Sequence, residues 1–159
     1  MPFTGTYDRS LDEKQRLPVP KQLRDELAKE SSSCVLYITP GTDGSLAIYS
    51  EKAFQEYAQM LSRLSANDPH VRTYMRLYYS QAEQVEMDKQ GRIRVPDRLM
   101  KLARLEHEVV LLGVHQHIEL WDKGLWEQFL TKNQSEFDQF ASQLQAVPMP
   151  PVLSTPAVG

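Results

Sequence analysis

Two short segments carry the residues whose types and spacing are best suited to chemistry, and they are nearly the same segment written twice. Residues 11–20 read LDEKQRLPVP and residues 87–96 read MDKQGRIRVP, so each places an aspartate four positions before an arginine. Such an aspartate accepts backbone hydrogen bonds and closes a turn. The arginine presents a planar fork of donors, which suits phosphate oxygens and the edges of bases. One copy alone would rather indicate an ordinary turn with a solvated arginine, but two matched copies suit a repeated target such as duplex DNA.

The two turns differ at the position before the arginine. The second copy has Gly91 there, and glycine adopts a positive φ without steric cost. The first copy has Gln15, for which the same conformation costs on the order of 1 kcal/mol. The first turn is therefore expected to be either strained or changed in shape.

Composition and charge limit the classes of protein to consider. A chain of 159 residues with 41% hydrophobic residues and a net charge of −3 is typical of a soluble globular protein. No apolar run approaches the length of a membrane span and the start lacks a signal-peptide pattern, so a cytoplasmic location without membrane partners is expected. Cys34, the single cysteine, excludes an internal disulfide and is expected to be a buried structural thiol. Positive charge gathers at the repeats, with a local +4 over residues 88–104 and +2 over residues 8–24.

The similarity continues beyond the turns, which indicates that a whole structural unit is duplicated. Residues 34–37 (CVLY) and 109–112 (VVLL) are comparable apolar runs. Residues 46–57 (LAIYSEKAFQEY) match residues 118–129 (IELWDKGLWEQF) at an offset of 72, against 76 for the turns. A shorter hairpin connection in the second copy explains the smaller offset.

Each copy is expected to contain a strand, the turn, a short strand ending at Val-Pro, a short helix, a hairpin and a longer helix. Apolar and polar residues alternate in the short strands, as in half-buried strands. Ser50 and Asp122 are expected N-caps of the longer helices, and Asp68 caps a helix between the copies. Aromatic stripes on these helices are interpreted as packing surfaces. The expected short helices are 21–29 and 97–104, and the expected hairpins are 34–39 with 45–49 and 108–114 with 117–121.

Two other groups of residues are candidates for different chemistry. His115, His117 and Glu119 share one strand face and could bind a metal, but two histidines without a further ligand are more often solvated or at a subunit contact. Asp12 and Asp88 could form a symmetric protease-like pair, which their bulky charged neighbours disfavour. No glycine-rich phosphate loop or nucleophile–histidine signature occurs in the sequence, so no enzyme activity, metal or cofactor is expected.

The chain resembles the MraZ family, whose unit is the swapped-hairpin motif of AbrB-type DNA-binding proteins. The resemblance rests on the pattern F-x-G-x-x-x-x-x-L-D-x-K-x-R of residues 3–16, on the following Pro20 and Arg24, and on the second D-x-x-G-R with its Val95-Pro96. It extends through the linking segment LSRLSANDPHVRTYMRLYYSQAEQVEMD and the IELWD end of the second hairpin. It covers the chain up to about residue 144.

The resemblance implies an α+β fold in which two AbrB-like halves form a pseudo-twofold, double-psi-like β-barrel core with peripheral helices. The expected divisions are residues 1–66 and 81–144 for the halves, 67–80 for a linking helix, and 145–159 for a flexible proline-rich tail. It also implies a transcriptional regulator of the cell-division and cell-wall gene cluster. Such a regulator would bind double-stranded DNA repeats upstream of its own operon as a ring of eight or twelve copies, at the nucleoid.

Carried over by position, Arg16 and Arg92 are the leading DNA-contact residues. Asp12, Asp88 and Gly91 are expected to form the turns, and the adjacent cations are further candidates: Lys14, Lys89 and Arg94. The first turn departs from the family pattern at Gln15, and Pro18 replaces the counterpart of Arg94, so the second turn is expected to carry more of the affinity. An AbrB-like antitoxin and a ring-forming scaffold with weakened DNA binding stay open as alternatives.

Overall fold

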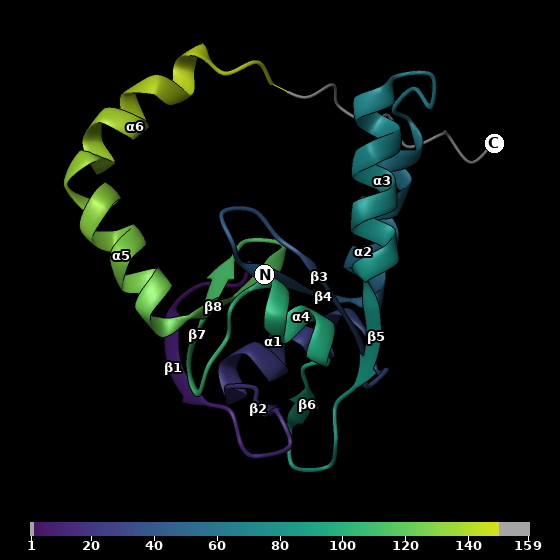
Figure 1. Cartoon of the computed structure of the whole chain (residues 1–159), viewed down its shortest axis with the longest axis vertical. Coiled ribbons are helices and arrows are strands. Elements are labelled where there is room, and N and C mark those ends of the chain that lie inside the picture. Colours follow the sequence, from purple (N-terminus) through teal and green to yellow (C-terminus); the bar gives the residue numbers. More distant parts are fainter. Residues whose placement is uncertain (1, 150–159) are drawn as a thin grey trace. The chain divides into compact units, whose positions relative to one another are not determined.

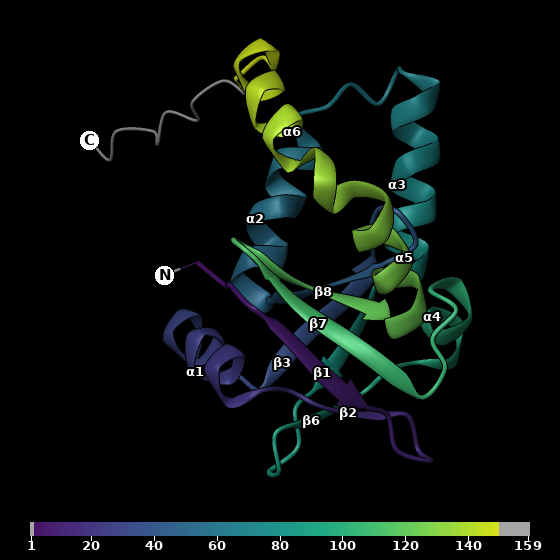
Figure 2. The same ribbon diagram turned by 90° about the vertical axis from the view of Figure 1, so that its left-hand side faces the viewer.

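The computed structural model describes residues 2–149 and has an α+β fold (Figures 1 and 2). The chain forms two compact units, Met1–Trp126 and Glu127–Gly159. The repeated turns and all strands belong to the first unit. The expected proline-rich tail falls largely outside the described residues.

All strand pairs of the first unit are antiparallel. A six-stranded sheet has the order β1-β7-β8-β4-β3-β5, and β2 pairs with β6 in a separate two-stranded ribbon. The strands are β1 Thr6–Ser10, β2 Arg16–Pro18, β3 Val35–Pro40, β4 Leu46–Ser50, β5 Glu83–Glu86, β6 Arg92–Arg94, β7 Glu108–Val114 and β8 His117–Asp122.

When each strand of the large sheet is exchanged for its counterpart in the other copy, the same order results, read from the opposite edge. At its centre β4 pairs with β8, and Ala47 lies opposite Glu119, 72 positions later. In the ribbon, Leu17 lies opposite Ile93, 76 positions later. Each offset of the sequence repeat therefore marks a residue pair on a local twofold axis, which confirms that the chain contains a duplicated unit.

The two copies exchange strands, so neither completes a sheet by itself. β1 of the first copy pairs with β7 of the second, and β5, which precedes the second turn, pairs with β3 of the first. The hydrophobic core draws on both copies, and its most deeply buried members include Leu17, Leu23, Ile48, Ile93, Leu99, Ile118 and Leu120. The sheet and the core are therefore shared between the two copies.

The helices begin where the sequence provides caps. Ser50 Oγ accepts a hydrogen bond from Ala53 N at 3.1 Å, and Asp68 Oδ1 accepts one from His70 N at 2.8 Å. Asp122 Oδ2 accepts one from Leu125 N at 3.2 Å. These three predicted caps are confirmed. The helices are α1 Lys21–Glu30, α2 Glu51–Ser62, α3 Pro69–Gln81, α4 Asp97–Leu102, α5 Lys123–Asn133 and α6 Phe137–Gln143, with 3-10 turns at Gln134–Glu136 and Leu144–Ala146.

Two predictions about side-chain burial need correction. Cys34 is exposed, because it precedes β3 and only the strand itself enters the core, so the prediction of a buried structural thiol is wrong. The stripes on α2 and α3 are only partly buried: Leu61 and Tyr78 are covered, whereas Met60 and Leu64 are about half exposed. No helix in residues 2–149 combines the length and apolar character needed to span a membrane.

Candidate nucleic-acid interface

Both repeated turns lie at one end of the first unit, beside the β2–β6 ribbon and away from α2 and α3 (Figures 1 and 2). The antiparallel pairing of β2 with β6 brings them there, because each turn leads directly into one strand of the ribbon. Residues 76 positions apart in sequence thus form a single surface.

In the first turn, Asp12 organises both the backbone and the arginine. Its Oδ1 accepts hydrogen bonds from Lys14 N and Arg16 N, both at 2.9 Å. Its Oδ2 accepts from Arg16 Nε at 2.6 Å. The turn closes with Gln15 N donating to the Asp12 carbonyl oxygen at 2.9 Å. In this geometry the aspartate closes the turn and also fixes the direction of the guanidinium.

The second turn repeats this geometry. Asp88 Oδ1 accepts from Gln90 N and Arg92 N, and Oδ2 accepts from Arg92 Nε, each at 2.9 Å. Backbone hydrogen bonds from the arginine, aided by its guanidinium, hold the pKa of Asp12 and of Asp88 below the usual value. Both carboxylates are consequently ionised at neutral pH and form no proton-sharing protease pair.

The lowered pKa of these two carboxyls predicts a loss of stability in acid. A folded-state pKa below the unfolded value stabilises the fold fully above about pH 4, and the contribution is lost as pH falls through the lowered value. Asp12→Asn/Asp88→Asn keeps one acceptor oxygen in each turn for the backbone N–H groups, and it removes the charge together with the oxygen that accepts from the arginine Nε. At pH 6 we expect wild type to have a larger free energy of unfolding than the double variant, as measured by urea unfolding. The difference between the two proteins should become smaller toward pH 2.5. A gap of constant size would contradict the stated cause.

The turns also hold each other across the twofold. Val95 N donates to the Gln15 carbonyl oxygen, and Val19 N donates to the Gly91 carbonyl oxygen, both at 2.9 Å. Gln15 has φ 62° and Gly91 has φ 76°, so both lie in the left-handed region. The first turn has kept its shape despite the missing glycine. Of the two outcomes expected from the sequence, strain is the one observed.

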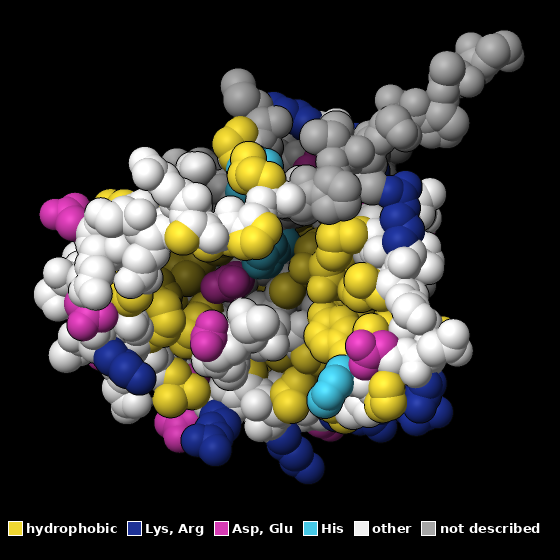
Figure 3. Space-filling model, turned by 90° about the horizontal axis from the view of Figure 1, so that it is seen from above, with side chains coloured by type: hydrophobic (Ala, Val, Ile, Leu, Met, Phe, Trp, Pro, Cys, Tyr) yellow, Lys and Arg dark blue, Asp and Glu magenta, His cyan; other side chains and the backbone are white. Residues whose placement is uncertain are grey.

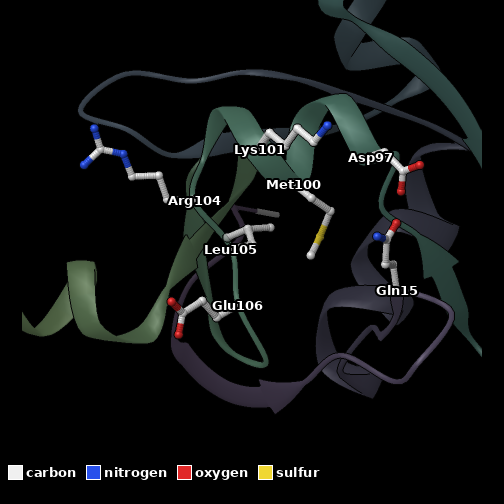
Figure 4. Close-up of a pocket in the computed structure, with 7 residues that line it drawn as sticks. All are labelled: Gln15, Asp97, Met100, Lys101, Arg104, Leu105 and Glu106. Carbon is white, nitrogen blue, oxygen red and sulfur yellow. The ribbon is translucent and has the colours of Figure 1, made fainter.

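The neighbour of each turn explains which residue fits there. A Cβ on Gly91 would lie 2.8 Å from Arg24 Cδ and 2.9 Å from its Nε. The counterpart of Arg24, 76 positions later, is Met100, and with Gln15 it lines a pocket of about 480 Å³ (Figure 4). The second turn requires glycine because an arginine crosses it, whereas the first has room for a side chain.

Gln15 is nevertheless a costly choice. Its Oε1 is buried and has no hydrogen-bond partner among the described residues. Gln15→Gly relieves the positive φ and removes that oxygen, so we expect a gain of about 1 kcal/mol in unfolding free energy. Gln15→Ala removes the oxygen alone and should gain less. Urea unfolding of the three proteins checks this order; a less stable glycine variant would show that the glutamine side chain has a role that outweighs its strain.

Arg16 and Arg92 are each bound by an aspartate but remain partly exposed to solvent. The side chain of Arg16 is 34% exposed and that of Arg92 is 27% exposed. Each uses Nε for its aspartate, and within the described residues its Nη1 and Nη2 groups make no hydrogen bond. Each arginine therefore folds back onto the aspartate of its own turn. The terminal fork stays available while the rest of the side chain is fixed.

The other cations do not all lie at the turn to which they are adjacent in sequence. Lys14 and Lys89 are exposed in their own turns, as the sequence indicates. Arg94 follows the second turn, but its Nε lies 3.3 Å from the Lys14 carbonyl oxygen in the first. Arg24, which is absent from the sequence-based candidates, crosses the second turn and donates from Nε to the Val19 carbonyl oxygen at 3.0 Å. In the sequence, the glycine at position 91 is the one sign that a side chain lies close to the second turn.

The histidine candidates do not assemble a metal site. His117 Nε2 lies 3.3 Å from Glu119 Oε2, whereas His115 is exposed in the turn between β7 and β8. Within residues 2–149, no three His, Cys, Asp or Glu side chains are grouped to hold a metal ion.

Strand exchange, a local twofold and paired Asp–Arg turns define a duplicated α+β protein whose two turns carry arginines and exposed lysines. Comparison with known proteins agrees with this class. The family model described as "MraZ protein, putative antitoxin-like" matches twice, over residues 2–77 and 78–147. The chain belongs to the MraZ family.

Curated relatives match over nearly their full length. A protein named transcriptional regulator MraZ from Mesoplasma florum is 32% identical over 144 residues, which cover 91% of this chain and 96% of the relative. Proteins of the same name from Pediococcus pentosaceus and Finegoldia magna are each 35% identical over 142 residues, covering 89% of this chain and 96% of each relative.

Proposed function

We propose that the protein is a sequence-specific DNA-binding transcriptional regulator. In this proposal it acts in the cytoplasm, at the nucleoid, on repeated sites upstream of its own operon in the cell-division and cell-wall gene cluster. The pair of turns with aspartate-held arginines is the observation that carries the proposal. The name of the curated relatives supports a regulatory role.

The fixed arginines suit base recognition. Because each Nε is bound by an aspartate, less side-chain freedom remains to be lost when the Nη groups meet a base. A guanidinium fork can pair with guanine O6 and N7 in the major groove, and a good pair discriminates by about 1–3 kcal/mol. Lys14 and Lys89, both exposed, are placed to contact phosphates.

Assembly is the second part of the proposal. The exchange of β1 and β5 between copies supports a swapped-hairpin, AbrB-like barrel. Two turns give few DNA contacts, so a ring of eight or twelve copies on tandem sites would gain affinity through effective concentration. Exposed apolar side chains of the second unit favour contacts between copies: Phe137, Phe140, Leu144 and Met149.

The test is a titration of the protein with labelled DNA from upstream of its own operon and with shuffled DNA of the same composition. Anisotropy at two salt concentrations should give tighter binding to the upstream repeats and a steep loss with salt. Mass photometry of the same samples reports ring formation separately. Equal affinity for both DNAs would favour a scaffold with weakened DNA binding over a regulator.

The lysines should contribute mainly to the salt dependence. Each phosphate contact changes the slope of log K against log salt by about 0.9. Lys14→Ala/Lys89→Ala is therefore expected to flatten the slope by about 2 per pair of occupied turns. The preference for upstream over shuffled DNA should persist. Loss of that preference with an unchanged slope would assign the lysines to bases instead.

An antitoxin is a second candidate, favoured by the words of the family description. In that case the exposed apolar side chains of residues 127–149 would bind a toxin. A toxin gene beside this one, whose product co-purifies with the chain and is released by Phe137→Ser, would support the candidate. Co-purification unaffected by Phe137→Ser would exclude this surface.

A further inference from the structure

A tyrosine-lined pocket lies on the outer face of the large sheet. It has a volume of about 390 Å³ and is formed by β4, β8, α2 and α3, all within the first unit. In β4, Ala47 and Tyr49 face the pocket, whereas Leu46 and Ile48 point into the core on the other side. Glu119 of β8 also faces the pocket. Figure 3 shows this side of the sheet, with hydrophobic side chains gathered around acidic and histidine groups. The pocket opens away from the repeated turns and takes no part in the proposed DNA contacts.

Four tyrosine rings line the pocket. The rings of Tyr49 and Tyr57 stack with centroids 5.9 Å apart, and Tyr57 meets Tyr78 edge-on at 5.5 Å. Tyr74 stacks on Tyr78 at 5.6 Å, and its hydroxyl lies 2.8 Å from that of Tyr57. The faces of such rings attract cations, most strongly where water is excluded.

Among these rings lies the carboxylate of Glu119, which within residues 2–149 pairs with a histidine and with no lysine or arginine. The Glu119 side chain is only 20% exposed. It pairs with His117 and accepts a hydrogen bond from Trp121 Nε1 at 3.0 Å, and these interactions keep its pKa below the usual value. Among the described residues, neither lysine nor arginine lines the pocket. A partly buried carboxylate with so little positive charge beside it favours a cationic ligand.

The tyrosine hydroxyls offer acceptors to the same ligand. Tyr78 is 4% exposed, and among the described residues its buried Oη makes no well-formed hydrogen bond, with the Thr39 side chain as its polar neighbour. Burial raises the pKa of Tyr49 to about 12 and raises the pKa of Tyr78 as well, so both hydroxyls stay neutral at physiological pH. An unpaired buried hydroxyl is unfavourable, and an N–H donor from a ligand would satisfy it.

We propose that this pocket binds a small organic ammonium ion that carries N–H donors. The ammonium group lies against the tyrosine rings, with Glu119 as its counter-charge and Tyr78 Oη as an acceptor. An alkyl chain on the ligand occupies the remaining apolar wall, which suits a primary amine better than an inorganic cation.

The test uses n-butylammonium, with n-butanol as a neutral control of similar shape and tetramethylammonium as a cation without N–H donors. Calorimetry at constant ionic strength, with tyrosine fluorescence as a second signal, should show saturable binding of butylammonium. Butanol and tetramethylammonium should each bind at least tenfold more weakly. Equal binding of butanol would show an apolar pocket only, and no saturable binding of butylammonium would overturn the proposal.

Two variants locate the site. Glu119→Gln keeps an acceptor for Trp121 and removes the charge, and Tyr57→Leu removes one ring; each should weaken butylammonium binding at least tenfold. Glu86→Gln, which removes an exposed carboxylate from β5, is the matched control and should change nothing. Undiminished binding in Glu119→Gln would contradict the proposal. Upstream-DNA affinity of the same variants should stay at the wild-type value, so failure of either proposal can be told from failure of the other.

Discussion

Replacing both Arg16 and Arg92 by alanine is expected to lower affinity for upstream DNA at least 30-fold. Each arginine that pairs with a base contributes about 1–3 kcal/mol, and two together account for about 30-fold to 20,000-fold per pair of turns. The fold should survive, because the Asp12 and Asp88 side chains still accept the backbone N–H groups of their turns. Anisotropy with upstream and shuffled DNA measures the effect.

A matched control separates base contact from simple loss of charge. Lys52→Ala/Arg76→Ala removes the same number of positive charges from exposed positions on α2 and α3, away from the turns. It should lower affinity no more than a few-fold. If this control and the turn variant lose affinity equally, the arginines contribute only long-range attraction.

Gly91→Gln is expected to destabilise the protein by about 2 kcal/mol and to weaken DNA binding. The added Cβ would lie within 3 Å of Arg24 at a positive φ of 76°, so both backbone strain and displacement of the Arg24 side chain follow. The hydrogen bond from Val19 N to the Gly91 carbonyl oxygen would shift with the turn. Urea unfolding and DNA anisotropy measure the two effects.

Adding Arg24→Met should recover part of the loss. The double variant Gly91→Gln/Arg24→Met gives the second turn the pair that the first turn already has, Gln15 and Met100. We expect the destabilisation of the double variant to be smaller than the sum of the two single changes by at least 0.5 kcal/mol. Additive losses would show that Arg24 is not the neighbour that makes glycine necessary.

Local signals predicted the elements of this fold well. A cap such as Ser50, with a strand before it and a helical stripe after it, fixes a boundary whatever the rest of the chain does. The duplication was also visible, because both offsets of the repeat mark residue pairs on the local twofold. The pairing of β1 with β7 was not predicted, since nothing within either segment specifies its partner.

The site was less accessible from sequence than the fold. The Asp–Arg spacing indicated the turns, but not that each arginine folds back onto its aspartate. Arg94 contacts the first turn although it follows the second, because the antiparallel ribbon places it opposite Arg16. Sequence adjacency therefore assigned charge to the wrong turn. The expectation that the second turn contributes more of the DNA affinity stays a prediction. Arg24 is now a further cation at the second turn.

The central claim is that both turns contact DNA, and directed cleavage tests it most directly. In a Cys34→Ser background, an iron chelate is attached at Lys14→Cys, at Lys89→Cys or at Lys52→Cys, and each protein is bound to upstream DNA. Hydroxyl-radical cuts should appear at each repeat from positions 14 and 89, at two distinct places, with none from position 52. Cuts from position 52 alone would contradict the claim that the paired turns face the DNA.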